Sequence, residues 1–139
     1  GMRVDSQMSN LSRREFSYLL TIKRYNDSGE GAKINRIAKD LKIAPSSVFE
    51  EVSHLEEKGL VKKKEDGVWI TNNGTRSINY LIKAHRVIEI LLVNIGIDKQ
   101  TACEYSKQFD YLIPEEIIDK LYNYLGKPSY CPHGLEIPL

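Results

Sequence analysis

The order of local signals between residues 34 and 71 constrains this chain more than any other feature. A short stretch with apolar residues at helical spacing, Ile34–Leu41, is followed after three residues by a helix start with Pro45 near its first position. The helix predicted there carries apolar residues at i, i+4 and i+7, namely Val48, Val52 and Leu55. Gly59 stands where a helix cap belongs, and Asp66-Gly67 separates two β-prone runs, which is a hairpin signal. This succession of short helix, tight turn, helix and hairpin predicts a winged helix-turn-helix.

Further helices are predicted on both sides of this motif. One begins at Ser12, which has capping-box spacing to a glutamate three residues later. The longest is predicted from about Asn73 to Ile95, and two short helices follow, one after Asp98 and one from Pro114. The tail from residue 126 to 139 is rich in proline and glycine and is predicted to be irregular. The fold class is therefore mainly α.

We expect an N-terminal winged helix-turn-helix domain over residues 1–74 and a C-terminal helical dimerisation domain over residues 75–139. Hydrophobic residues at 41% and charged residues at 28% are globular values, and no apolar run reaches the roughly 18 residues of a membrane span. We therefore expect a soluble, cytoplasmic protein. Residues 1–76 have a net charge of +3 and residues 77–139 of −2, a weak pointer to nucleic acid in the first part.

The predicted second helix of the motif has small polar residues at its start, and such an end can enter a DNA major groove. Lysines on the hairpin can neutralise phosphates. A carboxylate at Glu50 would repel phosphate, although it can accept a hydrogen bond from a cytosine amino group. The residues predicted to contact DNA are Arg36, Ser46, Ser47, Phe49, Glu50, Ser53, Lys62, Lys63 and Lys64. The alternative is a helical domain in which the two serines are only a helix cap.

Polar residues also interrupt the apolar face of the long helix. His85 and Glu89 stand four residues apart on that face, and a buried carboxylate needs a partner. The partner could be the histidine itself, a basic group from elsewhere, or a divalent metal ion. Cys131 and His133 lie in a tail with few apolar residues of its own, and Cys103 offers a further thiol. These five residues make a plausible site for Zn²⁺, Fe²⁺ or Mn²⁺.

Nearly the whole chain resembles the diphtheria-toxin-repressor family of iron- and manganese-dependent regulators. The matching segments include Ile37-Ala38, Pro45-Ser46-Ser47-Val48, Gly59-Leu60-Val61, Ala84-His85-Arg86, Glu89 and Cys131-Pro132-His133-Gly134. The resemblance implies a homodimer that binds a palindromic operator in double-stranded DNA when metal is bound and represses metal-uptake genes. It also implies a short form without the SH3-like domain of many members. One family metal site would fall on the five residues named above.

The resemblance implies a second metal site as well, and its positions here are Ser17, Lys107, Asp110 and Tyr111. Only Asp110 is a credible ligand among them. Lys107 would place an ammonium group where a cation should bind. We therefore expect one metal site and a degenerate second one, in which Lys107 mimics the bound cation and holds the dimer in one state.

Two other functions remain open at this point. The chain could be a metal-independent regulator whose metal residues have become a structural core. It could also be a winged-helix protein-interaction module that has lost DNA binding, which Glu50 and the weak basic excess favour. An enzyme is not expected, because the chain has three histidines, no nucleophile motif and no glycine-rich phosphate loop.

Overall fold

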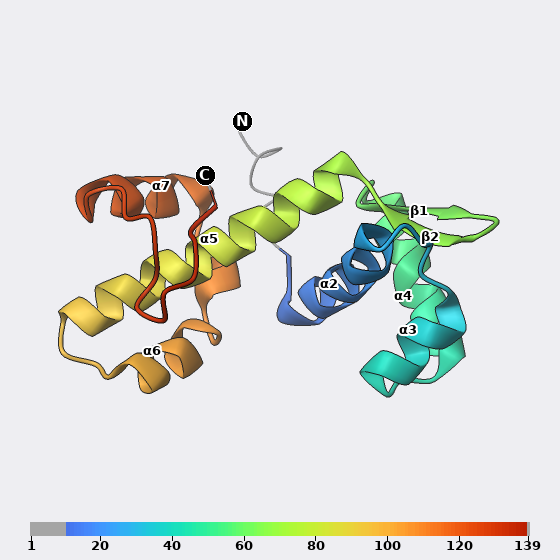
Figure 1. Cartoon of the computed structure of the whole chain (residues 1–139), viewed down its shortest axis with the longest axis horizontal. Coiled ribbons are helices and arrows are strands. Elements are labelled where there is room, and N and C mark those ends of the chain that lie inside the picture. The colour runs from blue at the N-terminus through green and yellow to red at the C-terminus, as the bar shows by residue number, and fades with distance from the viewer. Residues whose placement is uncertain (1–10, 139) are drawn as a thin grey trace. The chain divides into compact units, whose positions relative to one another are not determined.

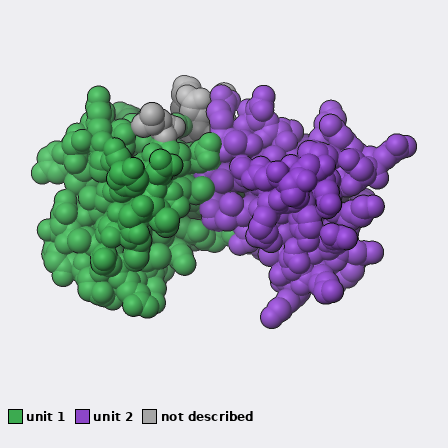
Figure 2. Space-filling model, in the orientation of Figure 1, with its two compact units in different colours: residues 1–13, 79–139 green, residues 14–78 purple. Residues whose placement is uncertain are grey.

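The computed structural model describes residues 11–138, which form two compact units (Figures 1 and 2). Among the described residues, one unit is Arg14–Ile78, and the other consists of residues 79–138 together with residues 11–13. The long helix α5 (Asn72–Asn94) contributes residues to both units. None of the described helices is both long and apolar enough to cross a membrane.

The unit Arg14–Ile78 is a winged helix-turn-helix. It contains most of α2 (Arg13–Asp27), followed by α3 (Ile34–Leu41), α4 (Pro45–Glu57), β1 (Val61–Lys64) and β2 (Gly67–Ile70). The two strands are antiparallel. The predicted stripe on α4 packs inward, because Val48, Val52 and Leu55 are fully buried. Three apolar residues of α2 are fully buried as well: Tyr18, Leu19 and Ile22.

The predicted hairpin is present. Lys64 pairs with Gly67, so the turn residues are Glu65 and Asp66. Gly67 begins β2 with a φ of 127°, where its backbone passes against Gly31. A Cβ atom on Gly67 would lie 2.6 Å from the Gly31 carbonyl carbon, and no side chain fits there. This close approach lets a further bridge, Ala32 with Val68, attach the hairpin to the segment before α3.

The second unit is helical. The part of α5 from Asn79 onward is joined by α6 (Lys99–Ser106), a 3₁₀ turn η1 (Asp110–Leu112) and α7 (Glu115–Tyr124). Its core forms around Ala84, Ile88 and Ile118. Asp98 caps α6, because its carboxylate accepts hydrogen bonds from the backbone amides of Gln100 and Thr101. The helix ends at Ser106, and Phe109 beyond it is 36% exposed.

The tail is more ordered than its composition suggests. The Cys131 amide donates to the Leu135 carbonyl at 2.8 Å, and the Gly134 amide donates back to the Cys131 carbonyl at 2.9 Å. Gly134 has a φ of 82°, which is accessible to glycine and closes this tight turn. A bridge between Tyr130 and Glu136 extends the turn into a small hairpin. The tail is therefore a defined loop that presents the side chains of residues 131–133.

Candidate metal centre and nucleic-acid interface

The candidate metal centre is built around Glu89 on α5. Its side chain is 2% exposed, and its Oε2 atom has no hydrogen-bond partner among the described residues. His85 lies one turn earlier on the same helix, with Nε2 at 3.6 Å from that oxygen. His133 from the tail places Nδ1 at 3.2 Å from it. A buried carboxylate oxygen between two imidazoles is costly unless a positive charge, from a metal ion or from a protonated imidazole, lies beside it.

The two cysteines complete two ligand groups that share Glu89. His85, Glu89 and Cys103 form one group, and Glu89, Cys131 and His133 form the other, with the ligand atoms of each group within 4.8 Å of one another. Cys103 comes from α6, and its Sγ lies 3.5 Å from His85 Nε2. Figure 1 shows the tail, drawn in red, crossing α5 in this unit. All five residues predicted as ligands thus gather around one carboxylate.

The donor set fits a borderline transition metal. Thiolate and imidazole ligands with one carboxylate suit Zn²⁺ or Fe²⁺ better than the hard cations Mg²⁺ and Ca²⁺. Burial, reinforced by the nearby Glu89 carboxylate, raises the pKa of the Cys103 thiol. Without a metal the thiol therefore holds its proton, and a metal ion would have to displace it. The Glu89 oxygen without a hydrogen bond and these donors together suit a divalent metal ion.

The four residues assigned to a second site are divided between the two compact units, with Ser17 in one and Lys107, Asp110 and Tyr111 in the other. Ser17 and Lys107 are exposed and Tyr111 is half-buried, whereas Asp110 is fully buried. The expectation for Lys107 needs correction, because the ion pairs of Asp110 within the described residues are with Arg13 and His85. Lys107 instead ends α6 at the surface. The cation beside Asp110 is the guanidinium of Arg13.

Sequence reasoning missed Arg13. It lies 97 positions from Asp110 in the chain, so no local pattern connects the two. The sequence predicts only that it lies at the start of a helix. A signal was present in principle, since a carboxylate predicted inside a helical unit needs a positive partner and Arg13 follows the proposed cap directly.

The candidate nucleic-acid interface is the start of α4 with the adjacent hairpin. Pro45 is the first residue of α4 and the N-cap is Ala44, which has no capping side chain, so the serines are not caps. Most of the predicted contact residues are exposed, and two are half-buried. The exposed ones are Arg36, Ser46, Phe49, Glu50, Lys62, Lys63 and Lys64, and the half-buried ones are Ser47 and Ser53.

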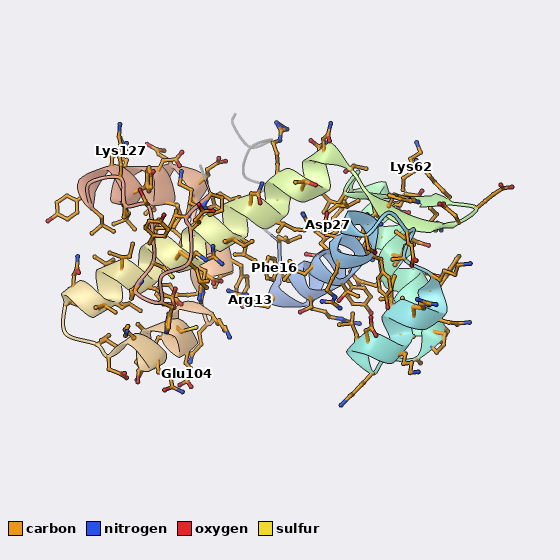
Figure 3. The ribbon with its side chains drawn as sticks, viewed as in Figure 1. Arg13, Phe16, Asp27, Lys62, Glu104 and Lys127 are labelled. Atoms are coloured by element: carbon orange, nitrogen blue, oxygen red, sulfur yellow. The ribbon has the colours of Figure 1, made fainter. Side chains whose placement is uncertain are left out.

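Lys63 differs from the other two hairpin lysines because it contacts α4. Its Nζ donates to Ser53 Oγ at 2.9 Å and lies 4.4 Å from the centre of the Phe49 ring. Its backbone amide donates to the Glu56 carboxylate at 2.9 Å. These contacts fix the hairpin against α4, while Lys62 extends from β1 (Figure 3). The surface thus has a helix start flanked by basic residues, which is the geometry of a winged-helix DNA reader.

A winged helix-turn-helix followed by a helical unit with a thiol, imidazole and carboxylate cluster defines a class, the metal-responsive DNA-binding regulators. Residues 10–68 match the family model of the iron dependent repressor N-terminal DNA binding domain. Residues 71–139 match that of the iron dependent repressor metal binding and dimerisation domain. The chain therefore belongs to the iron-dependent repressor family, whose members are transcription regulators and not enzymes.

Individual relatives agree with this assignment. An uncharacterized HTH-type transcriptional regulator of Aeropyrum pernix is 34% identical over 124 residues, which are 86% of this chain and 68% of that protein. The diphtheria toxin repressor of Corynebacterium diphtheriae is 28% identical over 123 residues, 87% of this chain and 54% of that protein. The chain thus spans about half the length of the latter.

Solved structures give the same result. ScaR with bound Zn²⁺ superposes with a TM-score of 0.75 at 25% identity, covering 89% of this chain and 59% of ScaR. IdeR of T. acidophilum gives a TM-score of 0.62 at 31% identity, with the same coverage of both chains.

Proposed function

We propose that this protein is a cytoplasmic, metal-responsive repressor that binds a palindromic operator as a homodimer. One divalent ion, Fe²⁺, Mn²⁺ or Zn²⁺, would be held by His85, Glu89, Cys103, Cys131 and His133. The observation that carries the proposal is the buried Glu89 oxygen, which lacks a hydrogen bond among the described residues and has these donors around it. We also propose that the DNA-binding domain covers residues 1–74 and the dimerisation domain residues 75–139.

The bound ion would supply a positive charge for the Glu89 carboxylate. The chain's own residues then determine what the ion connects, because they come from three segments of one unit. His85 and Glu89 belong to α5, Cys103 to α6, and Cys131 and His133 to the tail. Binding would therefore cross-link two helices and the tail, and it would require both thiols to release their protons.

On the DNA side, the exposed start of α4 would enter the major groove, with Ser46 and Ser47 donating to phosphates or base edges. Lys62 and Lys64 would contact the phosphate backbone from the hairpin. Because Lys63 already contacts Ser53 and Phe49, we expect it to contribute more to the rigidity of the surface than to phosphate contacts.

The metal half of the proposal is tested by metal content. We expect wild-type protein to retain about one equivalent of metal after desalting. Glu89→Gln should lose it, whereas the same substitution at Glu104, an exposed residue beside Cys103 (Figure 3), should not. Equal metal content in the two variants would refute the assigned site.

The DNA half is tested by the salt dependence of binding to mixed-sequence duplex DNA. Lys62→Gln should weaken binding and lower the slope of log K against log salt by about one, because one phosphate contact is lost. The control is Lys127→Gln on the other unit, which should change neither. No binding to duplex DNA at low salt, with or without metal, would favour the protein-interaction module instead.

One observation favours a metal-independent regulator as the second candidate. Arg13 already places a permanent positive charge on Asp110, the one credible ligand of the second site. Under this alternative, DNA affinity is the same with metal and with chelator. Under our first proposal, chelator lowers it.

A further inference from the structure

The two ring nitrogens of His85 lie in different surroundings. Nε2 is directed at the metal cluster, 3.6 Å from Glu89 Oε2 and 3.5 Å from Cys103 Sγ. Nδ1 is directed away from it, 3.0 Å from Asp110 Oδ2 and 3.0 Å from Ser106 Oγ. The imidazole therefore joins the candidate metal cluster to a fully buried carboxylate.

The groups around Nδ1 determine which nitrogen carries the hydrogen. When the Ser106 hydroxyl donates to the Cys103 carbonyl, which lies at 3.0 Å, its oxygen is available to accept from the ring. The Asp110 carboxylate is also an acceptor. The donor Arg13 Nη2 also lies 3.3 Å from Nδ1, but it forms its ion pair with Asp110 Oδ2, and that carboxylate is the nearer partner of the ring at 3.0 Å. The nearest charged acceptor therefore favours the hydrogen on Nδ1 and leaves the lone pair on Nε2, where a metal would bind.

Arg13 provides the charge that makes this arrangement stable. Its guanidinium forms an ion pair with Asp110 Oδ2. Both residues belong to the same compact unit as His85, and Figure 3 shows Arg13 at the start of α2. A buried carboxylate without a positive partner would be strongly unfavourable. The guanidinium is permanently charged, so it would also repel a second divalent ion from Asp110.

We propose that Asp110 and Arg13 are positioning residues for the metal site. Asp110 accepts the hydrogen of His85 Nδ1 and so fixes the Nε2 lone pair toward Glu89 and Cys103. Arg13 holds the Asp110 carboxylate in place and occupies the position of a second cation. The chain accordingly binds one ion. This inference rests on the proposed metal site, and its first test needs no metal.

That test is the tautomer of His85 in metal-free protein, measured by long-range ¹H–¹⁵N NMR at about pH 8, where an ordinary imidazole is neutral. We expect the hydrogen on Nδ1 in the wild type and a mixture of tautomers in Asp110→Asn. The matched control is Asp119→Asn, which removes the exposed partner of Lys83 in the same unit and should leave His85 unchanged. A wild-type ring with its hydrogen on Nε2 would overturn the proposal.

The second test is affinity for Co²⁺, followed by its absorption spectrum. Asp110→Asn should weaken binding by about 10- to 100-fold, the usual effect of losing a group that orients a ligand. Arg13→Gln should weaken it as well, since nothing then holds the carboxylate beside His85. Arg13→Lys should restore most of the affinity, because it keeps the charge. Together with the control variant Asp119→Asn, these proteins separate positioning from general destabilisation.

The outcomes distinguish this inference from the proposed function. If no protein binds Co²⁺ while the tautomers behave as expected, the metal site fails and the positioning of His85 stands. A wild type that binds two equivalents, one of which disappears in Asp110→Asn, would make Asp110 a ligand and overturn the inference. Unchanged affinity in both Asp110→Asn and Arg13→Gln would overturn it too.

Discussion

Replacing Glu89 by Gln should have opposite effects on stability with and without metal. In the metal-free protein, a buried carboxylate oxygen has no hydrogen bond among the described residues, and its side chain is 2% exposed. Leaving such a group unsatisfied costs about 1–3 kcal/mol. Glutamine has the same shape and no charge, and its amide group can donate to an imidazole nitrogen of His133 or His85. We therefore expect Glu89→Gln to stabilise the metal-free protein by about 1–2 kcal/mol.

With metal the order should reverse. An ion that binds only the folded wild type at 100 times its dissociation constant adds about 2.7 kcal/mol of stability. The variant gains little of this, because it has lost the ligand shared by both groups. With metal, the wild type should then be more stable than the variant by about 1–2 kcal/mol. This difference is the stabilisation of the wild type by the metal minus the stabilisation that Glu89→Gln gives without metal.

Urea unfolding followed by circular dichroism, in chelator and in excess Zn²⁺, measures both states. The control is Glu104→Gln, where the glutamate is exposed and should give wild-type values under both conditions. The reasoning is refuted if Glu89→Gln is less stable than the wild type in chelator by more than about 1 kcal/mol, because the carboxylate would then be making a favourable interaction as it stands.

Three further results are expected. Metal affinity should rise with pH around neutrality, because burial raises the pKa of the Cys103 thiol and the metal must displace its proton. The expected rise is about tenfold per pH unit for each thiol that must ionise. In a Zn²⁺ titration, Cys103→Ser should therefore lower the slope of log K against pH by about one. Tyr80→Phe should cost about 1 kcal/mol in urea unfolding, since the phenol donates to the Ile113 carbonyl at 2.7 Å. Burial also raises the pKa of the Tyr80 phenol. The stability that the neutral phenol contributes is therefore complete below its ordinary pKa near 10 and is lost as the pH rises above that value. Urea unfolding at a series of alkaline pH values would detect this loss. Gly31→Ala should cost roughly 1–3 kcal/mol and weaken DNA binding in a gel shift, because its Cβ would lie 2.5 Å from the Asp66 carbonyl oxygen.

Local patterns accounted for most of the fold. The apolar spacing of α4 and the helix start at Pro45 follow from backbone geometry within one or two turns, and the structure confirms both. The five candidate ligands could be named from the sequence because a histidine and a glutamate interrupt an apolar helix face and the tail carries a distinctive cysteine and histidine. Whether they bind metal remains a prediction.

Interactions between distant segments could not be predicted in the same way. The ion pair of Arg13 with Asp110 depends on how a helix start meets a 3₁₀ turn late in the chain, which no local spacing records. The family resemblance named Lys107, but its position at the end of α6 exposes it. The close approach of Gly67 to Gly31 also joins segments that are distant in the sequence, so the hairpin signal alone could not predict it.

The hairpin is fastened at two places, to the segment before α3 by the bridge of Ala32 with Val68 and to α4 by Lys63. We therefore expect α4 and the hairpin to move together. A DNA-binding surface that cannot change shape does not adapt to grooves of different width. DNA sequences that widen or narrow the grooves would therefore be bound more weakly, even at base pairs that the protein does not touch. The choice between DNA sites would then depend on the shape of the double helix as much as on its base sequence.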